Sequence, residues 1–317
     1  MRVLLAGATG YIGQAVLKEL VVEGHEVIAL TRPGSAEGLV SSPALTVIEV
    51  DVLSDAAWQK PLGRVDVVIS CIASRSGAPA DAERVEFCLN RELLQYAEHT
   101  GVSRFILLSA ICVQKPRLAF QREKLKFEAL LSSSSVPGTI IRPTAFFRSL
   151  AGQIDRVRAG RPFLLFGSGH LTACKPISDR DLARFMVLKL ADSDEGTRIY
   201  PIGGPGPALT PQEQGRMLCE ALGKPFTTTS IPPEMFDWLR WLIAPLAWFS
   251  SGMRDRAEFL KIAKFYATES MLVWDEQRGC YDADATPSYG QDTLEQFFER
   301  VVRDGMAGQD LGDASLF

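Results

Sequence analysis

The chain has 317 residues, of which 46% are hydrophobic and 23% are charged, which is the composition of a globular protein with one large or two modest cores. Its formal net charge of −4 offers no bulk attraction for nucleic acid, whose binding depends on many basic side chains. The six cysteines are scattered without paired spacing, so the sequence predicts neither a disulfide framework nor a zinc or iron–sulfur site. We therefore expect a cytoplasmic protein with no nucleic-acid partner and no metal site.

The N-terminus runs from Met1 through a short apolar segment straight into a glycine turn, which leaves no room for a secretory signal peptide. The nearest candidate for a membrane span, residues 241–249, falls short of the roughly 18 apolar residues that a spanning helix needs. The sequence therefore predicts a chain that is not secreted and does not cross a membrane.

Short apolar runs alternate with helical patterns over the first part of the chain. The runs cover residues 3–6, 27–30, 45–50, 65–70, 104–109 and 139–142. Between the first two runs, Ile12, Val16, Leu20 and Val21 recur at helical spacing, and Gly24 is placed to end the helix. The alternation predicts repeated βαβ units, and hence an α/β fold with a doubly wound parallel sheet of the Rossmann type.

Beyond residue 142 the pattern loosens into loops rich in glycine and proline. A further helix and strand, within about residues 178–204, are expected to return to the sheet. We therefore expect a Rossmann domain over residues 1–144 and a smaller C-terminal substrate lobe over residues 145–317, interrupted by that return.

Residues 236–249 hold three of the five tryptophans of the chain. The pattern favours a buried pair of helices. Two alternatives are a wall for a large flat apolar ligand and a peripheral contact with a membrane surface, because exposed aromatic patches tend to be interaction sites.

A glycine-rich turn follows the first predicted strand and opens the first predicted helix, which is the context of a dinucleotide-binding turn. In this arrangement Gly7 permits the tight turn, Gly10 lets backbone N–H groups approach a pyrophosphate, and Gly13 allows the helix to pack closely on the strand. We expect cofactor contacts from the whole turn, which consists of Gly7, Ala8, Thr9, Gly10, Tyr11, Ile12 and Gly13.

The Gly-x-x-Gly-x-x-Gly spacing of this turn resembles the short-chain dehydrogenase/reductase superfamily. NAD enzymes place an acid against the adenosine ribose at the tip of the second strand, whereas this chain has Thr31 and Arg32 there and no acid before Glu37. Arg32 can pair with a 2′-phosphate, so the sequence favours NADPH, with a solvated surface charge as the alternative. Asp51 and Val52, after the third strand, are expected to contact adenine, with a plain turn or a cap as the alternative.

Superfamily members that act on carbonyls carry a Tyr-x-x-x-Lys pair on one helix, and the matching segment here runs from Phe120 to Lys124. Because positions i and i+4 share a helix face, Lys124 keeps the place that reaches the nicotinamide ribose, unless it is an ordinary solvated lysine. Phenylalanine cannot exchange a proton, so we expect reduction of a carbon–carbon double bond rather than of a carbonyl. Ser109, at the end of the fifth strand, is a second catalytic candidate, with a backbone hydrogen bond as the alternative.

Several longer segments resemble the divinyl chlorophyllide 8-vinyl reductases. They are residues 107–116, 120–128, 141–147, 173–178, 201–206, 267–273, 286–290 and 305–309. The resemblance implies NADPH-dependent reduction of the 8-vinyl group of 3,8-divinyl chlorophyllide a or protochlorophyllide a to an ethyl group, in chlorophyll or bacteriochlorophyll biosynthesis for photosynthesis. Plant members carry a transit peptide before the first strand, so the start of this chain suggests a bacterial or processed form, in the cytoplasm or peripheral to photosynthetic membranes.

Two other functions remain open from the sequence. The first is a non-catalytic NADP(H) sensor of the NmrA-like kind, and the second is an ene reductase for a smaller phenolic substrate, similar to the isoflavone reductase-like proteins. Both alternatives keep the glycine turn and Lys124.

With a magnesium tetrapyrrole as substrate, we expect hydride to add to the terminal vinyl carbon and a proton to the inner carbon, with water, Lys124 or Ser109 as the proton donor. Aromatic rings are expected to line the substrate pocket, basic side chains to pair with its propionate and a histidine to bind its magnesium, although ordinary core or surface roles are alternatives for all of them. These substrate candidates are Phe120, Phe146, Phe147, Arg148, His170 and Lys175. The remaining expected cofactor contacts are Ala73, Ser74, Pro143, Thr144, Ala145 and Phe146.

Overall fold

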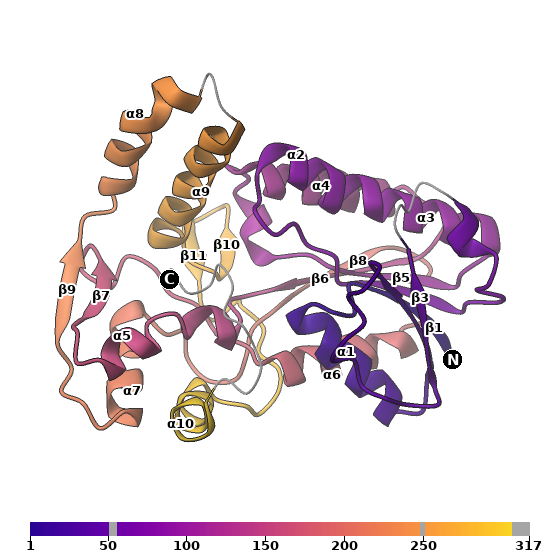
Figure 1. Cartoon of the computed structure of the whole chain (residues 1–317), viewed down its shortest axis with the longest axis horizontal. Coiled ribbons are helices and arrows are strands. Elements are labelled where there is room, and N and C mark those ends of the chain that lie inside the picture. The colour runs from indigo at the N-terminus through magenta and orange to yellow at the C-terminus, as the bar shows by residue number, and fades with distance from the viewer. Residues whose placement is uncertain (51–55, 248–250, 306–317) are drawn as a thin grey trace. The chain divides into compact units, whose positions relative to one another are not determined.

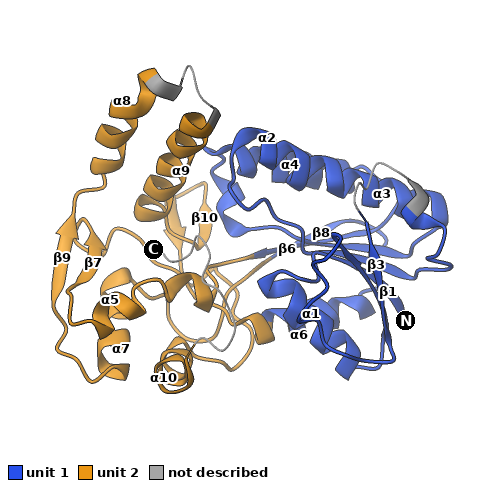
Figure 2. Cartoon of the chain, in the orientation of Figure 1, with its two compact units in different colours: residues 1–142, 182–200 blue, residues 143–181, 201–317 orange. Residues whose placement is uncertain are grey.

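The computed structural model describes residues 1–50, 56–247 and 251–305 (Figure 1). The chain divides into two compact units (Figure 2). Unit 1 contains residues 1–142 and 182–200, and unit 2 contains residues 143–181 and 201–317.

The main sheet has seven strands in the order β3-β2-β1-β4-β5-β6-β8. Pairing is parallel from β3 through to β6. The strands are β1 (Arg2–Ala6), β2 (Glu26–Thr31), β3 (Leu45–Glu49), β4 (Val67–Ser70), β5 (Arg104–Leu108), β6 (Gly138–Pro143) and β8 (Arg198–Ile202). Every expected strand is present, and the predicted doubly wound Rossmann-type sheet is confirmed.

Helices cover both faces of this sheet, with α1 and α6 on one face and α2, α3 and α4 on the other (Figure 1). Their bounds are α1 (Tyr11–Val22), α2 (Pro79–Ala82), α3 (Leu89–Thr100), α4 (Ala119–Ser132) and α6 (Asp179–Leu188), and a π-helical segment (Glu83–Cys88) joins α2 to α3. Strands buried on both faces consist of near-continuous apolar runs, which explains the composition of β1, β4 and β5 apart from the polar residues at their ends. Leu4, Phe105, Phe127 and Ile140 are fully buried in the core between sheet and helices.

Unit 2 contains two small sheets and a set of helices. β7 (Phe163–Phe166) pairs in parallel with β9 (Thr228–Ile231), and β10 (Val273–Asp275) forms an antiparallel hairpin with β11 (Cys280–Asp282). The helices are α5 (Ile154–Arg158), α7 (Pro211–Ala221), α8 (Met235–Ala247), α9 (Ser251–Thr268) and α10 (Leu294–Asp304). Phe147, Leu218, Phe297 and Phe298 form the centre of the core of this unit.

The tryptophan-rich segment corresponds to α8, which packs against α9 (Figure 1). The helix pair is present, but the prediction that its aromatic residues are buried is wrong for Trp238, which is 62% exposed, and for Trp241, which is 76% exposed. Of the three aromatic residues of this segment that the structure describes, Phe236 is the one that packs into the core, against Phe166. Trp248 and Phe249 lie outside the described residues. Among the described helices, none is both long enough and apolar enough to span a membrane.

Candidate functional site

The glycine turn between β1 and α1 is closed so tightly that side chains are sterically excluded at two positions. Gly7 has φ of 82°, and a Cβ there would lie 2.7 Å from the backbone carbonyl atoms of Cys71. A Cβ on Gly13 would lie 2.0 Å from the carbonyl oxygen of Gly7. The turn therefore brings the start of α1 directly against the ends of β1 and β4.

The start of α1 is arranged to receive an anion. The first-turn N–H groups of a helix have no partner within the helix, and the preceding residue, Gly10, brings no capping side chain. No acidic residue occupies this first turn, so the positive end of the helix dipole is not offset. Thr31, at the end of the adjacent strand β2, has a buried hydroxyl without a hydrogen-bond partner in the structure. These features fit a dinucleotide whose pyrophosphate lies against α1.

Arg32 follows β2 directly and is exposed. Its carbonyl oxygen accepts a hydrogen bond from the Ser35 hydroxyl at 2.7 Å, which shapes the loop after the strand. The backbone N–H of Gly34 donates to the carboxylate of Glu49 at 3.0 Å. A carboxylate from the neighbouring strand β3 therefore contacts this loop, although the sequence after β2 shows no acid before Glu37. Asp51 and Val52 lie outside the described residues.

Lys124 lies on α4 with its side chain only 9% exposed, which excludes the solvated alternative. Its Nζ donates to a carboxylate oxygen of Glu86 at 2.7 Å. Phe120, one turn earlier on the same helix, is 9% exposed, so the position of the expected tyrosine is occupied by a buried benzene ring. Burial raises the pKa of the nearby Cys71 thiol to about 12. The positive charge of Lys124 acts in the opposite direction and lowers that pKa.

Glu86 belongs to the π-helical segment and is 2% exposed. Its second carboxylate oxygen accepts hydrogen bonds from the backbone N–H of Ser74 at 2.8 Å and from the Ser74 hydroxyl at 2.9 Å. The amide of Asn90 donates to the carbonyl oxygen of Glu86 at 2.9 Å, and the Ser70 hydroxyl donates to the same amide at 2.5 Å. The expected cofactor residue Ser74 is therefore joined to Lys124 through Glu86, whereas its neighbour Ala73 is exposed.

Ser109 follows β5, and its hydroxyl donates to the carboxylate of Glu128 at 2.5 Å. Glu128 is 3% exposed and is also held by the guanidinium of Arg142, whose Nε donates at 3.2 Å and whose second nitrogen bonds the other carboxylate oxygen. The proton of the Ser109 hydroxyl is thus directed toward a buried carboxylate inside unit 1.

The expected cofactor residues after β6 lie in unit 2. The Thr144 N–H donates to the carbonyl of Ile202 at 2.9 Å, and the Thr144 hydroxyl donates to the carbonyl of Lys175. Ala145 and Phe146, which follow Pro143, pair with Ile177. The backbone of this segment is therefore fixed within unit 2.

The substrate candidates of unit 2 lie in different surroundings. Phe147 is 2% exposed and packs on Phe297 with ring centroids 5.4 Å apart, while Phe146 and Arg148 are half-buried. The Lys175 ammonium donates to the carbonyl oxygen of Thr286 at 2.9 Å and to the Ser288 hydroxyl at 3.3 Å. His170 is exposed. No group of His, Cys, Asp and Glu side chains suited to a metal ion occurs among the described residues.

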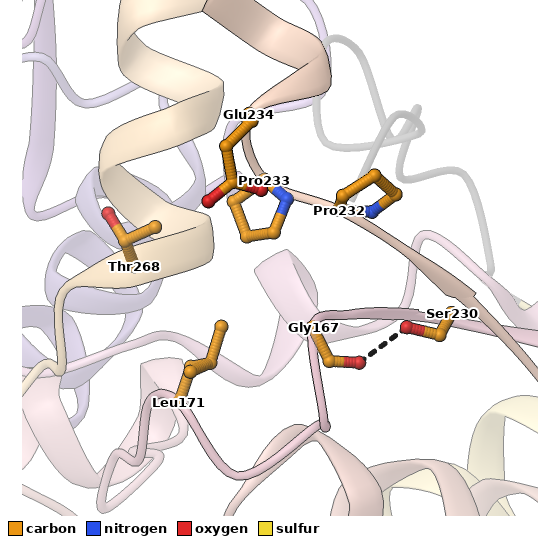
Figure 3. Close-up of a pocket in the computed structure, with 7 residues that line it drawn as sticks. All are labelled: Gly167, Leu171, Ser230, Pro232, Pro233, Glu234 and Thr268. Atoms are coloured by element: carbon orange, nitrogen blue, oxygen red, sulfur yellow. Dashed lines mark hydrogen bonds between the residues drawn. The ribbon is translucent and has the colours of Figure 1, made fainter.

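A pocket of about 530 Å³ opens in unit 2 beside the start of α8 (Figure 3). Its lining is Gly167, Leu171, Ser230, Pro232, Pro233, Glu234 and Thr268. The Ser230 hydroxyl donates to the carbonyl of Gly167 at 2.6 Å across one side of it. None of the candidate catalytic, cofactor or substrate residues lines this pocket, although Thr268 belongs to the segment 267–273 quoted above.

Three carboxylates that sequence reasoning missed organise these surroundings, namely Glu49, Glu86 and Glu128. Glu49 and Glu86 lie outside every segment that carries the family resemblance, and Glu128 ends the segment 120–128 without having been assigned a role. The hydrogen bonds to Gly34, Lys124 and Arg142 span 15, 38 and 14 residues of chain. The sequence feature that could have indicated a buried carboxylate is a charge next to apolar neighbours, such as Glu86 before Phe87 and Cys88.

The fold and the glycine turn define a dinucleotide-binding protein, and the chain matches the NAD(P)H-binding family model over residues 7–193. UDP-glucuronic acid 4-epimerase from Bacillus cereus, solved in complex with NAD, shares the fold with a TM-score of 0.67 and 15% identity, over 96% of this chain and 100% of that one. Divinyl chlorophyllide a 8-vinyl-reductase of Oryza sativa subsp. indica is 46% identical over 99% of this chain and 82% of its own length. The enzyme of the same name from Arabidopsis thaliana is 43% identical over 99% of this chain and 79% of its own length. The chain belongs to the divinyl chlorophyllide a 8-vinyl-reductase family.

Proposed function

We propose that this protein is an NADPH-dependent oxidoreductase that reduces the 8-vinyl group of 3,8-divinyl chlorophyllide a or protochlorophyllide a to an ethyl group, in chlorophyll or bacteriochlorophyll biosynthesis. The observation that carries the proposal is identity of 43% to 46%, over 99% of the chain, to enzymes named for reducing that vinyl group. The proposed substrate is accordingly a small molecule of the tetrapyrrole class.

The residues on α4 agree with alkene rather than carbonyl chemistry. Bound NADPH would supply a hydride. A ketone would also need a proton at oxygen from a side chain in the place of Phe120, which has no exchangeable proton. Addition across a vinyl group forms no alkoxide, because the negative charge spreads into the conjugated macrocycle. The ring of Phe120 is therefore compatible with the reaction proposed here.

A proton must still reach the inner vinyl carbon, and Lys124 is the favoured donor of the two side chains considered. In this step an N–H bond of the ammonium breaks, a C–H bond forms with the electron pair left on the substrate, and the amine regains a proton from solvent. Ser109 is less suited because its hydroxyl already donates to Glu128 at 2.5 Å.

The cofactor assignment within unit 1 rests on three features. The Gly7 to Gly13 turn leaves space only for backbone beside the start of α1, the Thr31 hydroxyl is buried without a partner, and Arg32 is exposed where a 2′-phosphate would bind. We also propose cofactor contacts for Ala73 and Ser74 in unit 1 and, in unit 2, for the segment from Pro143 to Phe146.

Contacts with the substrate are proposed for Phe120 in unit 1 and for Phe146, Phe147, Arg148, His170 and Lys175 in unit 2. Lys175 is a candidate to meet a propionate: its ammonium donates to a carbonyl and a hydroxyl, and its charge also acts on the carboxylate of Asp282. A substrate esterified at the propionate should therefore show a higher KM. An unchanged KM would remove both Lys175 and Arg148 from substrate binding.

We further propose that α8 makes a peripheral contact with a membrane surface, of the photosynthetic membrane in a bacterial cell. Trp238, Trp241 and Leu242 are 62%, 76% and 62% exposed on this helix, and aromatic side chains favour the boundary between water and lipid. Co-sedimentation with anionic phospholipid vesicles should fall when both tryptophans are replaced by alanine. The matched control is Leu188→Ala on α6, also an exposed apolar residue at 56%.

The function is tested by incubating the purified protein with NADPH and 3,8-divinyl chlorophyllide a, and separating monovinyl from divinyl pigment by chromatography. We expect monovinyl product and NADPH oxidation in equal amounts. Tight NADPH binding without oxidation would instead favour a sensor. Oxidation of NADPH only with small phenolic alkenes would favour the alternative ene reductase.

A further inference from the structure

We propose that Glu86 is a positioning residue of the reductase, which holds Lys124 as an ammonium ion at one fixed place in the interior of unit 1. This inference rests on the proposed function, in which Lys124 meets the cofactor and supplies the proton. It assigns a role to a carboxylate that lies outside every motif of the sequence.

The first argument is the cost of burying a charge. The Lys124 side chain is 9% exposed and that of Glu86 is 2% exposed, and their atoms lie 2.7 Å apart. A buried charge is costly unless it is paired and hydrogen-bonded, and the carboxylate of Glu86 provides that partner. Glu86 therefore compensates the charge of the Lys124 ammonium group, from which a proton can be donated to carbon.

The second argument is that the carboxylate is itself held in place. One oxygen of Glu86 receives two hydrogen bonds from Ser74, which leaves the other oxygen for Lys124. The π-helical segment that carries Glu86 is fixed by the amide of Asn90, which donates to the carbonyl of Glu86 and accepts from Ser70. A π-helical turn inserts a residue into a helix and is frequent at functional sites.

The third argument is the position of the Lys124–Glu86 pair relative to the glycine turn. The positive charge of Lys124 acts on the thiol of Cys71, and the backbone of Cys71 lies against Gly7. The charge of Lys124 therefore acts on a residue that lies directly against the glycine turn. Glu86 reaches Lys124 from the π-helical segment, and the thiol on which the Lys124 charge acts belongs to Cys71, at the end of β4.

The test compares two substitutions of Glu86 with a control in the same segment. Glu86→Gln keeps the shape and removes the charge, and Glu86→Asp keeps the charge and shortens the side chain. Glu83→Gln removes an exposed charge from the same π-helical segment. We expect Glu86→Gln to lower kcat about tenfold or more, Glu86→Asp to retain more activity than Glu86→Gln, and Glu83→Gln to behave as wild type.

A purely structural role would show as a loss of stability alone. Glu86→Gln breaks a buried pair and should lower the melting temperature, so kcat is measured well below that temperature, where the variant is folded. A kcat in folded Glu86→Gln equal to that of the Glu83 control would overturn the proposal.

A double-mutant cycle separates this inference from the proposed function. If Glu86 acts through Lys124, Glu86→Gln should weaken NADPH binding, measured by nicotinamide fluorescence, in the wild type and have no further effect in Lys124→Met. Additive losses would refute the positioning role. Because this readout needs no pigment, failure of the wild type to reduce divinyl chlorophyllide would refute the proposed function alone.

Discussion

Helix α4 contributes one residue to each of two buried ion pairs, and the partners of these residues lie on different elements of unit 1. Lys124 and Glu128 lie one turn apart on α4, at a spacing that would allow them to pair with each other. Instead Lys124 pairs with Glu86 at 2.7 Å, and Glu128 pairs with Arg142 and accepts from Ser109.

The partners explain the difference. Arg142 lies in β6 and Ser109 follows β5, so Glu128 ties together the carboxyl ends of two neighbouring strands. Glu86 instead lies on a π-helical segment next to Ser74, an expected cofactor residue, and presents its carboxylate to Lys124. We infer that the Glu128 pair serves the fold and that the Glu86 pair serves the reaction, even though both are buried to a similar degree.

The largest effect is expected from Lys124→Met, which should lower kcat by about two to three orders of magnitude, because it removes the proposed proton donor and the contact with the nicotinamide ribose. Steady-state kinetics with divinyl chlorophyllide and NADPH measure this. Lys126→Met on the same helix removes an exposed lysine, paired with Glu123 at 3.4 Å, and should leave kcat unchanged. Normal turnover by Lys124→Met would exclude Lys124 from the mechanism and make both pairs structural.

Glu128→Gln tests the other side of the comparison. It leaves the Arg142 guanidinium without its carboxylate, and breaking a buried pair in this way costs about 3 kcal/mol of the free energy of unfolding. Urea denaturation measures the loss, with Glu123→Gln, a more exposed acid on the same helix, as the control. NADPH affinity should stay unchanged in the folded variant. A stable Glu128→Gln protein that no longer turns over would assign this pair to the reaction instead.

The fold was largely predictable because β1, β2, β4 and β5 are short runs made up mostly of apolar residues, and each run is followed by a helix or a turn signal. The Gly7 to Gly13 turn was predictable for the same local reason, as its spacing specifies its geometry. The position of Lys124 on α4 also followed from an i, i+4 pattern that any helix preserves. These features depend on neighbours in the sequence.

The remaining features depend on contacts between distant segments. Glu86 meets Lys124 across 38 residues, and nothing near Glu86 in the sequence indicates that its side chain is buried. The exposure of Trp238 and Trp241 was likewise not predictable, because an apolar helix face has the same pattern whether or not another element covers it. Asp51 and Val52, outside the described residues, remain predictions.

Arg32→Ala extends the comparison to the other end of the cofactor, far in sequence from Lys124. A hydrogen bond to a charged group contributes about 1.5–3 kcal/mol, so the preference for NADPH over NADH should fall about 10- to 100-fold. The ratio of kcat/KM for the two cofactors measures it, and NADH turnover itself should hardly change. Arg64→Ala removes another exposed arginine of unit 1, at 91% exposure, and should leave the ratio as it is. An unaltered ratio in Arg32→Ala would show that Arg32 is an ordinary surface charge.

The smallest expected effect concerns Cys71, which reports on whether the interior around Lys124 is closed. Burial raises the pKa of this thiol from 9.0 to about 12, so at pH 8 its reactive thiolate is about a thousandfold scarcer than that of an ordinary cysteine. Iodoacetamide should therefore modify the exposed Cys280 and spare Cys71, as peptide mass spectrometry would show. Because the pKa is raised, the thiol favours the folded state below about pH 9 and this contribution disappears as the pH rises toward 12. Rapid alkylation of Cys71 at pH 8 would mean that water reaches the Lys124–Glu86 pair, and the two pairs of α4 would then differ in exposure as well as in partners.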